Sequence, residues 1–316
     1  MEPAQSHRNK KFNVTFLRTL LSVTAVLTLS LFSCSKKDKW IEVDPGFSKY
    51  IDAYTTGTIS KTSAVRIKLA ADANSTHAVG EAVKESLFDF SPSVKGKAYW
   101  LDARTVEFKP DQLLKPNQLY EVSFKLGNVT KVPATFSEFR FNMKTVKPSF
   151  KISDDGLRSN GVKNKMSFSG DLETADVEDG KAVEKLLTAS QNNSTLKIAW
   201  QHNDAAKIHH YIIENIDRLK SVSNIDLRWD GSPMNMDVKG ERSVAVPAIG
   251  DFKVLDAVAV NDAQQYVSVQ FSDMIAVGQD LEGLITISGQ SDISYTINGS
   301  EVKVFGNGKL DGNYTV

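Results

Sequence analysis

The chain contains very little cysteine: Cys34 is the only one among its 316 residues. No disulfide can therefore form within one molecule, and the fold has to be held together by buried apolar side chains. After Cys34 the sequence has no apolar run long enough to cross a membrane as a helix. These two absences predict a body that folds around hydrophobic cores.

An excess of positive charge is also absent. The formal net charge is zero, and residues 1–40 hold seven basic and two acidic side chains, so residues 41–316 carry a charge of −5. A mildly acidic body lacks the electrostatic footprint that nucleic-acid binding requires. We expect no nucleic-acid partner.

Catalytic motifs are missing as well. The sequence has no Gly-x-Ser-x-Gly motif and no cysteine nucleophile to pair with a histidine, and the glycines of residues 278–289 lack phosphate-loop spacing. We therefore expect a protein that is not an enzyme and that needs no cofactor.

The first 33 residues have the layout of a secretory signal. A basic leader comes first, with Arg8, Lys10, Lys11 and Arg18, and residues 19–33 follow without a charged side chain. These 15 residues are too few to span a bilayer as a helix, which favours a cleaved signal peptide over residues 1–33.

The single cysteine ends this apolar stretch. The tetrad Leu31-Phe32-Ser33-Cys34 resembles the lipobox of bacterial lipoproteins, with a bulky Phe32 at its second position. The resemblance implies cleavage before Cys34, a lipid on Cys34 and a body held at a bacterial membrane. The alternative is an ordinary secretory signal beside an incidental cysteine.

Residues 34–50 are expected to be the lipidated cysteine and a tether. Residues 35–39 are predominantly basic, whereas an acidic run at this place marks export to the surface in the lipoproteins of some bacteria. The basic tether favours a location in the bacterial cell envelope, at the outer membrane and facing the periplasm.

Alternating apolar and polar residues predict β-strands throughout the body. The clearest examples are residues 64–69, 106–108, 119–126 and 139–143. On the strand at 119–126, Tyr120, Val122 and Phe124 share one face, and Tyr120 is placed like a corner tyrosine whose hydroxyl binds loop backbone. Trp100, Trp200 and Trp229 also lie in strands, where core positions are favoured over a row of sugar-binding rings.

The sequence contains an internal repeat. Residues 99–108 align without a gap with residues 295–304, residues 64–69 align with 266–271, and residues 119–122 have a shorter echo in 313–316. In this alignment Tyr99 corresponds to Tyr295. The same order of strands therefore recurs near the two ends of the body.

The segment between the two copies has the same character. Residues 165–170 and 225–229 read as strands, residues 196–200 and 207–216 form a hairpin around Asn203 and Asp204, and residues 179–190 are either helical turns or an irregular edge. We predict an all-β chain of tandem β-sandwich modules at 51–147, 148–249 and 250–316. The third stops where its copy continues, which predicts an N-terminal fragment of a longer polypeptide.

Three features together resemble the N-terminal part of bacterial α2-macroglobulin-like lipoproteins. They are the lipobox at Cys34, the tandem modules, and the module pattern of residues 64–69, 99–110 and 114–120. The resemblance implies macroglobulin or Ig-like domains and inhibition of endopeptidases by entrapment, with proteases as the partners of the full-length protein. The alternative is a general Ig-like envelope lipoprotein, an adhesin or a glycan-binding arm.

The chemistry of that family does not carry over to this chain. A thioester needs a cysteine followed by Glu-Gln, whereas Cys34 is followed by Ser35 and Lys36. No thioester and no bait segment is identified in these residues. Cys34 is therefore the one functional residue that the resemblance assigns.

Two clusters of polar residues are candidates for metal sites. His202, His209 and His210 lie near Asp204, but adjacent strand residues point to opposite faces, so His209 and His210 cannot both bind one metal ion. The acids at 154–155 and 176–179 lack the spacing of a calcium loop and are expected to be solvated loop residues. No metal site is predicted.

Overall fold

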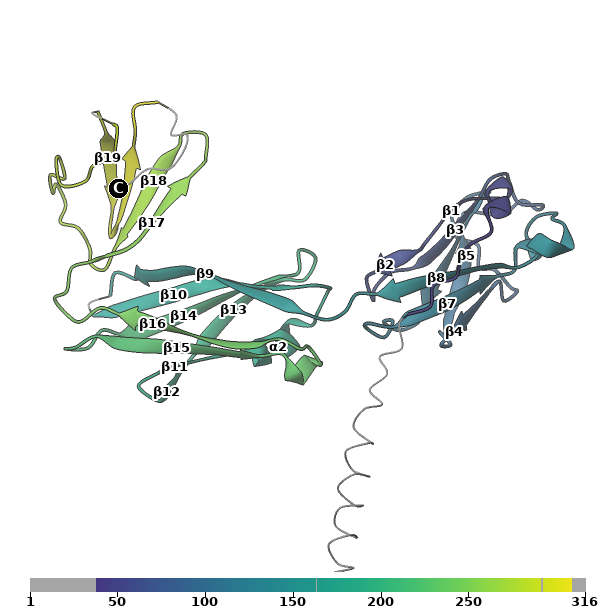
Figure 1. Cartoon of the computed structure of the whole chain (residues 1–316), viewed down its shortest axis with the longest axis horizontal. Coiled ribbons are helices and arrows are strands. Elements are labelled where there is room, and N and C mark those ends of the chain that lie inside the picture. Colours follow the sequence, from purple (N-terminus) through teal and green to yellow (C-terminus); the bar gives the residue numbers. More distant parts are fainter. Residues whose placement is uncertain (1–37, 163, 291, 309–316) are drawn as a thin grey trace, which may run out of the picture. The chain divides into compact units, whose positions relative to one another are not determined.

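The structure is a computed structural model that describes residues 38–162, 164–290 and 292–308 (Figure 1). Within these ranges the chain forms 20 strands and only short helical turns, so the prediction of an all-β chain is confirmed. None of the helices in the described ranges has the length and hydropathy needed to span a bilayer. Cys34, the signal sequence and residues 313–316 lie outside the described residues, and the predictions for them stay predictions.

Two four-stranded sheets form the first sandwich, with the orders β1-β3-β6-β5 and β2-β8-β7-β4. All neighbouring strands are antiparallel except β2 and β8, which are parallel. The strands of the first sheet are β1 (Ile51–Tyr54), β3 (Val65–Leu69), β6 (Thr105–Pro110) and β5 (Gly96–Trp100). Those of the second are β2 (Gly57–Ile59), β8 (Phe139–Thr145), β7 (Leu119–Phe124) and β4 (Phe88–Ser91). The 3-10 helices η1 (Pro45–Lys49), η2 (Leu126–Asn128) and η3 (Ala134–Phe136) flank these strands.

The core of the first sandwich lies between its two sheets. Alternation places Val65 and Ile67 of β3 and Val122 of β7 inside, each fully buried and all in one cluster. The strand predicted for residues 119–126 ends at Phe124, because the chain turns there into η2. Apolar burial between two layers is what stabilises a chain that has no disulfide.

Tyr120 confirms the predicted corner tyrosine. Its ring is 3% exposed, and its hydroxyl accepts a hydrogen bond of 3.0 Å from the backbone N–H of Lys115. The bond ties the loop before β7 to the strand that the loop leads into.

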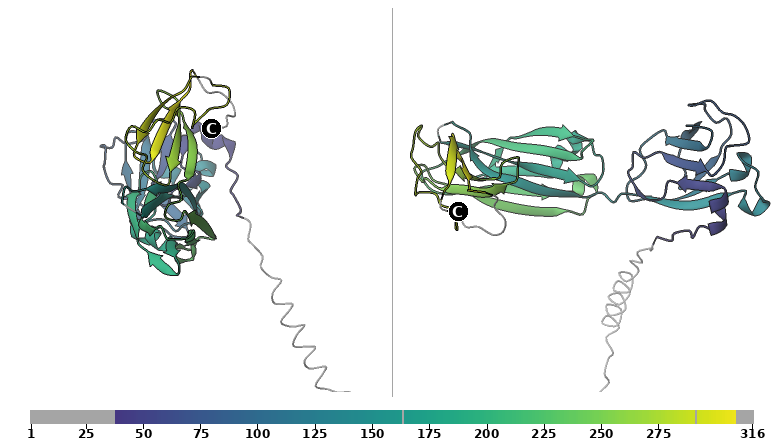
Figure 2. Two further views of the ribbon diagram at one scale, coloured as in Figure 1. Left: turned by 90° about the vertical axis from the view of Figure 1, so that its left-hand side faces the viewer. Right: turned by 90° about the horizontal axis from the view of Figure 1, so that it is seen from above.

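The second sandwich also has two four-stranded sheets, with the orders β13-β14-β10-β9 and β12-β11-β15-β16. Its long strands run side by side (Figures 1 and 2). The strands of the first sheet are β9 (Phe150–Ser159), β10 (Lys165–Thr174), β13 (Ile198–Asn203) and β14 (Ile208–Asp217). Those of the second are β11 (Leu187–Gln191), β12 (Ser194–Leu196), β15 (Ser223–Asp230) and β16 (Lys239–Val246).

The predicted hairpin around Asn203 and Asp204 is confirmed as β13 and β14. Residues 179–190, for which the sequence allows helical turns or an irregular edge, contain both helical turns and a strand. They comprise α2 (Gly180–Val183), η4 (Glu184–Leu186) and β11, and a further 3-10 helix, η5 (Ser232–Met234), follows β15.

A fifth sheet contains the C-terminal strands, in the order β17-β18-β20-β19. The strands are β17 (Val254–Val260), β18 (Tyr266–Phe271), β19 (Ser294–Asn298) and β20 (Glu301–Phe305). Its buried face holds Val267, Val269, Val302 and Val304, covered by side chains from residues 275–287. We call β17 to β20 the C-terminal sheet.

The internal repeat is visible in the sheet order. The orders β1-β3-β6-β5, β9-β10-β14-β13 and β17-β18-β20-β19 are the same when strands are matched in sequence, and every pair is antiparallel. The first and last sheets also share a β-bulge at one position. Ile51 faces Leu69 and Ala53 faces Lys68, just as Val254 faces Phe271 and Asp256 faces Gln270. Bulges are specific features of a fold, so the shared one strengthens the repeat.

The alignment of Tyr99 with Tyr295 is wrong by one residue. Ala98 faces Phe108 in the first hairpin, whereas Tyr295 faces Val304 in the second, so Tyr295 is the counterpart of Ala98 and Ile297 that of Trp100. The two hairpins have turns of different length, and a shift of one residue exchanges the two faces of a strand.

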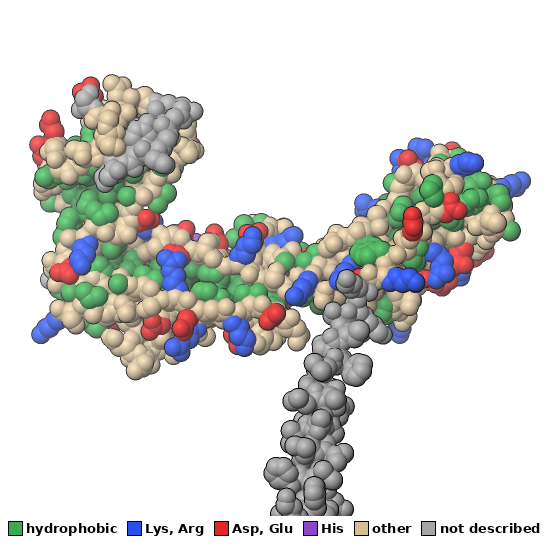
Figure 3. All heavy atoms as spheres, viewed as in Figure 1, with side chains coloured by type: hydrophobic (Ala, Val, Ile, Leu, Met, Phe, Trp, Pro, Cys, Tyr) green, Lys and Arg blue, Asp and Glu red, His purple; other side chains and the backbone are tan. Residues whose placement is uncertain are grey.

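The hydrophobic core of the described residues is divided into separate clusters: one within residues 51–143, two within residues 150–246 and one within residues 267–304. The module boundaries at 147 and 249 stay a prediction. On the face shown in Figure 3, positive and negative side chains are interspersed.

Candidate functional site

The histidines of the second sandwich come together in a way that the sequence did not reveal. His202 on β13 and His209 on β14 face each other directly across the hairpin, with 2.9 Å between their Nδ1 atoms. The Nε2 atom of His202 lies 3.3 Å from Oε1 of Glu184. Glu184 also binds Lys181, at 2.8 Å. A chain of polar contacts therefore leads from the surface to a fully buried imidazole.

When His202 and His209 are both neutral, these contacts determine which ring nitrogen of each histidine carries the hydrogen. The Glu184 carboxylate can only accept, so Nε2 of His202 carries the hydrogen and its Nδ1 accepts one from Nδ1 of His209. The Nε2 atom of His209 is then a hydrogen-bond acceptor. It is the one buried side-chain nitrogen or oxygen in the described residues that has no hydrogen-bond partner. Burial, followed by the neighbouring His202, lowers the pKa of His209 below its ordinary value.

His210 lies on the opposite face of β14, as predicted, where its Nδ1 is 2.9 Å from Asp171. Within the described ranges, no three side chains of His, Cys, Asp or Glu are grouped so that they could hold a metal ion. The pairing of His202 with His209 was missed because it depends on the register of the hairpin. Sequence spacing alone does not give that register.

Some of the acidic residues that the sequence predicts to be solvated are buried and bind protein donors. Asp176 was expected to be a solvated loop residue, but it is 3% exposed and accepts hydrogen bonds from Ser60 Oγ at 2.5 Å and Lys61 N at 2.7 Å. Lys61 also pairs with Glu178 at 2.7 Å. Asp155 accepts from Ser169 at 2.8 Å. Asp176 and Glu178 are therefore structural acceptors of protein donors, whereas Asp155 is exposed, as predicted.

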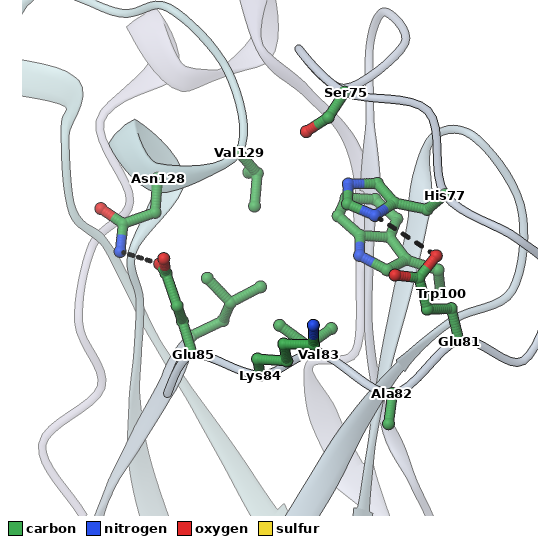
Figure 4. Close-up of a pocket in the computed structure, with 11 residues that line it drawn as sticks. Ser75, His77, Glu81, Ala82, Val83, Lys84, Glu85, Trp100, Asn128 and Val129 are labelled. Carbon is green, nitrogen blue, oxygen red and sulfur yellow. Dashed lines mark hydrogen bonds and ion pairs between the residues drawn. The ribbon is translucent and has the colours of Figure 1, made fainter.

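A cavity of about 230 Å³ lies at one edge of the first sandwich (Figure 4). The chain before β4 extends the sheet beyond β5: Gly80 N donates to Trp100 O at 2.7 Å, and Val83 N donates to Ala98 O at 2.9 Å. It then crosses to the other sheet, where Lys125 N donates to Leu87 O at 2.9 Å. Lys84 and Glu85 of the crossing segment form one wall of the cavity.

An aromatic pair forms the opposite wall. The imidazole of His77 is stacked on the indole of Trp100, with 4.1 Å between ring centroids and 5° between planes. Trp100 is 2% exposed, which confirms its predicted core position. Glu81 fixes the loop, since its carboxylate accepts from Ala78 N at 2.9 Å and lies 3.8 Å from Nδ1 of His77. The pair is therefore held in place before any ligand arrives.

Trp200 and Trp229 are half-buried and pack against the cores of the second sandwich. The indole of Trp200 lies beside the ring of Tyr211, with 5.8 Å between centroids. Both rings contribute to core packing.

Comparisons with known proteins give no family for this chain. No family model matches the chain, and no curated protein matches it. Surface layer protein SbsC, domains 1–6, aligns at 16% identity over 86% of this chain and 37% of that chain, with a TM-score of 0.33. L,D-transpeptidase 3 from Mycobacterium tuberculosis aligns at 16% identity over 38% of this chain and 44% of that chain, with a TM-score of 0.22. A marsupial T cell receptor aligns at 12% identity over 82% of this chain and 92% of that chain, with a TM-score of 0.19.

The chain spans less than half the length of the first two of these proteins. At such TM-scores the similarity carries no argument about function. The sheets described above make this chain a β-sandwich protein, and the macroglobulin resemblance stays a hypothesis.

Proposed function

We propose that this chain is the membrane-anchored arm of an α2-macroglobulin-like endopeptidase inhibitor in the bacterial envelope. The observation that supports it best is the repetition of one sheet order three times, with the same bulge in the first and last copies. Tandem modules of one topology form an extended scaffold, because each module has its own core. The arm itself performs no catalysis.

The anchor of this arm is the lipid proposed for Cys34. The basic leader, the uncharged stretch 19–33 and the Leu31-Phe32-Ser33-Cys34 tetrad support this site. Two or more acyl chains bind a membrane stably, whereas one chain binds it only marginally. The anchored protein faces the periplasm from the outer membrane, and its protein partners are proteases.

The anchor is tested by labelling cells with an alkyne-bearing fatty acid. The wild-type chain should incorporate the label and sediment with membranes, and Cys34→Ser should do neither. Ser35→Ala is the matched control, since it changes the next residue and leaves the cysteine. Labelling of the Cys34→Ser variant would disprove lipidation at this residue.

Trapping is tested on the full-length protein with a saturating amount of an endopeptidase. A trap keeps large proteins away from the enclosed protease and leaves it open to small peptides. We expect cleavage of a protein substrate to fall while cleavage of a peptide substrate continues. If both substrates are still cleaved, the trap is wrong, and binding to a glycan array then tests the adhesin alternative.

A further inference from the structure

The cavity in the first sandwich carries charges that nothing in the described residues neutralises. Lys84 and Glu85 line it from the crossing segment, and neither forms an ion pair within the described ranges. Glu85 has one polar neighbour, the neutral amide of Asn128, at 3.3 Å. Glu81, by contrast, already binds Ala78 and lies near His77. Lys84 and Glu85 are both exposed to solvent, so one ammonium and one carboxylate are accessible to a ligand.

The remaining walls limit the size and shape of such a ligand. Val83, Leu87 and Val129 supply an apolar surface, and the stacked His77 and Trp100 form a flat one (Figure 4). A cavity of about 230 Å³ is smaller than pockets for drug-sized molecules. It suits a compact molecule with a short apolar body and charged groups at its end.

Figure 4 places Glu85 beside Asn128 on one side of the cavity and Lys84 between Glu85 and the His77–Trp100 pair. We propose that this cavity binds a small zwitterion of amino-acid size, with its ammonium group against Glu85 and its carboxylate against Lys84. Charge-assisted hydrogen bonds are the strong ones in proteins, and a zwitterion is the ligand that forms both kinds here. The site is independent of the protease-trap proposal.

The test is a titration of the full chain by NMR, read at the indole N–H of Trp100. The chain has four tryptophans, so Trp40→Phe, Trp200→Phe and Trp229→Phe assign the Trp100 signal by elimination. The probes are alanine, ethylammonium and propionate, which share a two-carbon body and differ in their charged groups. We expect alanine to bind about tenfold or more tighter than either of the others, since each loses one charged contact.

Two substitutions separate the charges. Lys84→Met should weaken alanine about tenfold and leave ethylammonium unchanged, whereas Glu85→Gln should weaken alanine and leave propionate unchanged. Lys95→Met and Glu282→Gln are the matched controls: both residues are exposed and outside this cavity, so neither change should alter binding. If alanine binds no tighter than the single-charge probes, or if Lys84→Met and Glu85→Gln bind it normally, the proposal is wrong. It is equally wrong if the Trp100 signal does not move.

Discussion

At the scale of single residues, one hydroxyl fixes the loop that leads into β7. The hydroxyl of Tyr120 accepts the hydrogen bond from the N–H of Lys115 at 3.0 Å. Tyr120→Phe removes this acceptor and leaves the N–H without its partner, and we expect a loss of about 1 kcal/mol in the free energy of unfolding. Urea denaturation measures it. Tyr99→Phe is the control, because its hydroxyl has no hydrogen bond in the described residues, and equal losses in the two variants would contradict the role of Tyr120.

His209 gives the fold a predictable response to acid. Its pKa lies below the ordinary value of 6.5, because it is buried and because His202 lies beside it, while Asp204 opposes the shift. The unfolded chain therefore binds a proton at higher pH than the folded chain does. The stability that comes from keeping His209 buried and neutral is therefore fully present above about pH 6.5 and is lost as the pH falls below that value.

The test compares unfolding at pH 7.5 and pH 5 in wild type and in His209→Leu. We expect the variant to lose less stability on acidification than the wild type, because its buried side chain takes up no proton. His210→Asn is the matched control, since His210 lies on the same strand but faces Asp171 on the other side. The His210→Asn variant should lose as much stability between pH 7.5 and pH 5 as the wild type does. If the His209→Leu variant also loses that much, another group controls the response.

At the scale of strands and turns, the period of two in the sequence predicted most of what forms. The alternation at residues 64–69 and 119–126 became β3 and the slightly shorter β7, and the hairpin around Asn203 and Asp204 became β13 and β14. One face of each of these strands is buried, so the alternation of apolar and polar residues in its own sequence indicates which face lies inside. The sequence left open whether the middle segment shares the topology of its neighbours or only their order of strands, and the structure shows the same sheet order.

What the sequence could not give was register and partner choice. The shift of Tyr295 against Tyr99 arises from turn length, and the contact of His202 with His209 arises from the pairing of two strands. The parallel pairing of β2 with β8 joins segments that are distant in the sequence. Lys84 and Glu85 belong to an irregular segment without periodicity, so the cavity that they line had no signal in the sequence.

Arg218, directly after β14, ties several loops together. It is 6% exposed and donates hydrogen bonds to the carbonyl oxygens of Pro247, Ala248, Asp251 and Ser272 and to the carboxylate of Asp273. Arg218→Met leaves these acceptors without their donor, and we expect a loss of about 3 kcal/mol, the upper end of the cost of an unsatisfied buried partner, because several acceptors lose their donor at once. Denaturation followed by tryptophan fluorescence measures it.

Arg228→Met is the control for Arg218. The side chains of Arg228 and its partner Glu241 are 71% and 75% exposed, and exposed ion pairs contribute about 1 kcal/mol or less. Comparable losses in the two variants would show that the carbonyl contacts of Arg218 do not stabilise the fold.

At the scale of the whole molecule, sheets of one topology have unequal cover. In the first sandwich the strand β3 lies under a complete second sheet, and Val65 and Ile67 are fully buried. In the described residues the C-terminal sheet is covered by residues 275–287, which form turns rather than strands. Met274 and Leu284 beside this cover are 56% and 72% exposed. Equivalent strands of the repeat, such as β3 and β18, are therefore packed differently and can be compared.

Hydrogen exchange measures this difference directly. β3 and β18 occupy the same place in sheets of the same order, and each pairs at four positions with the next strand, β6 or β20, so the amides at these positions can be compared. Exchange from such amides requires local opening, and opening costs less where the apolar cover is thinner. We expect the amides of β18 to exchange on the order of tenfold or more faster than those of β3, after correction for sequence. Equal protection would mean that a cover of turns stabilises a central strand as well as a second sheet does.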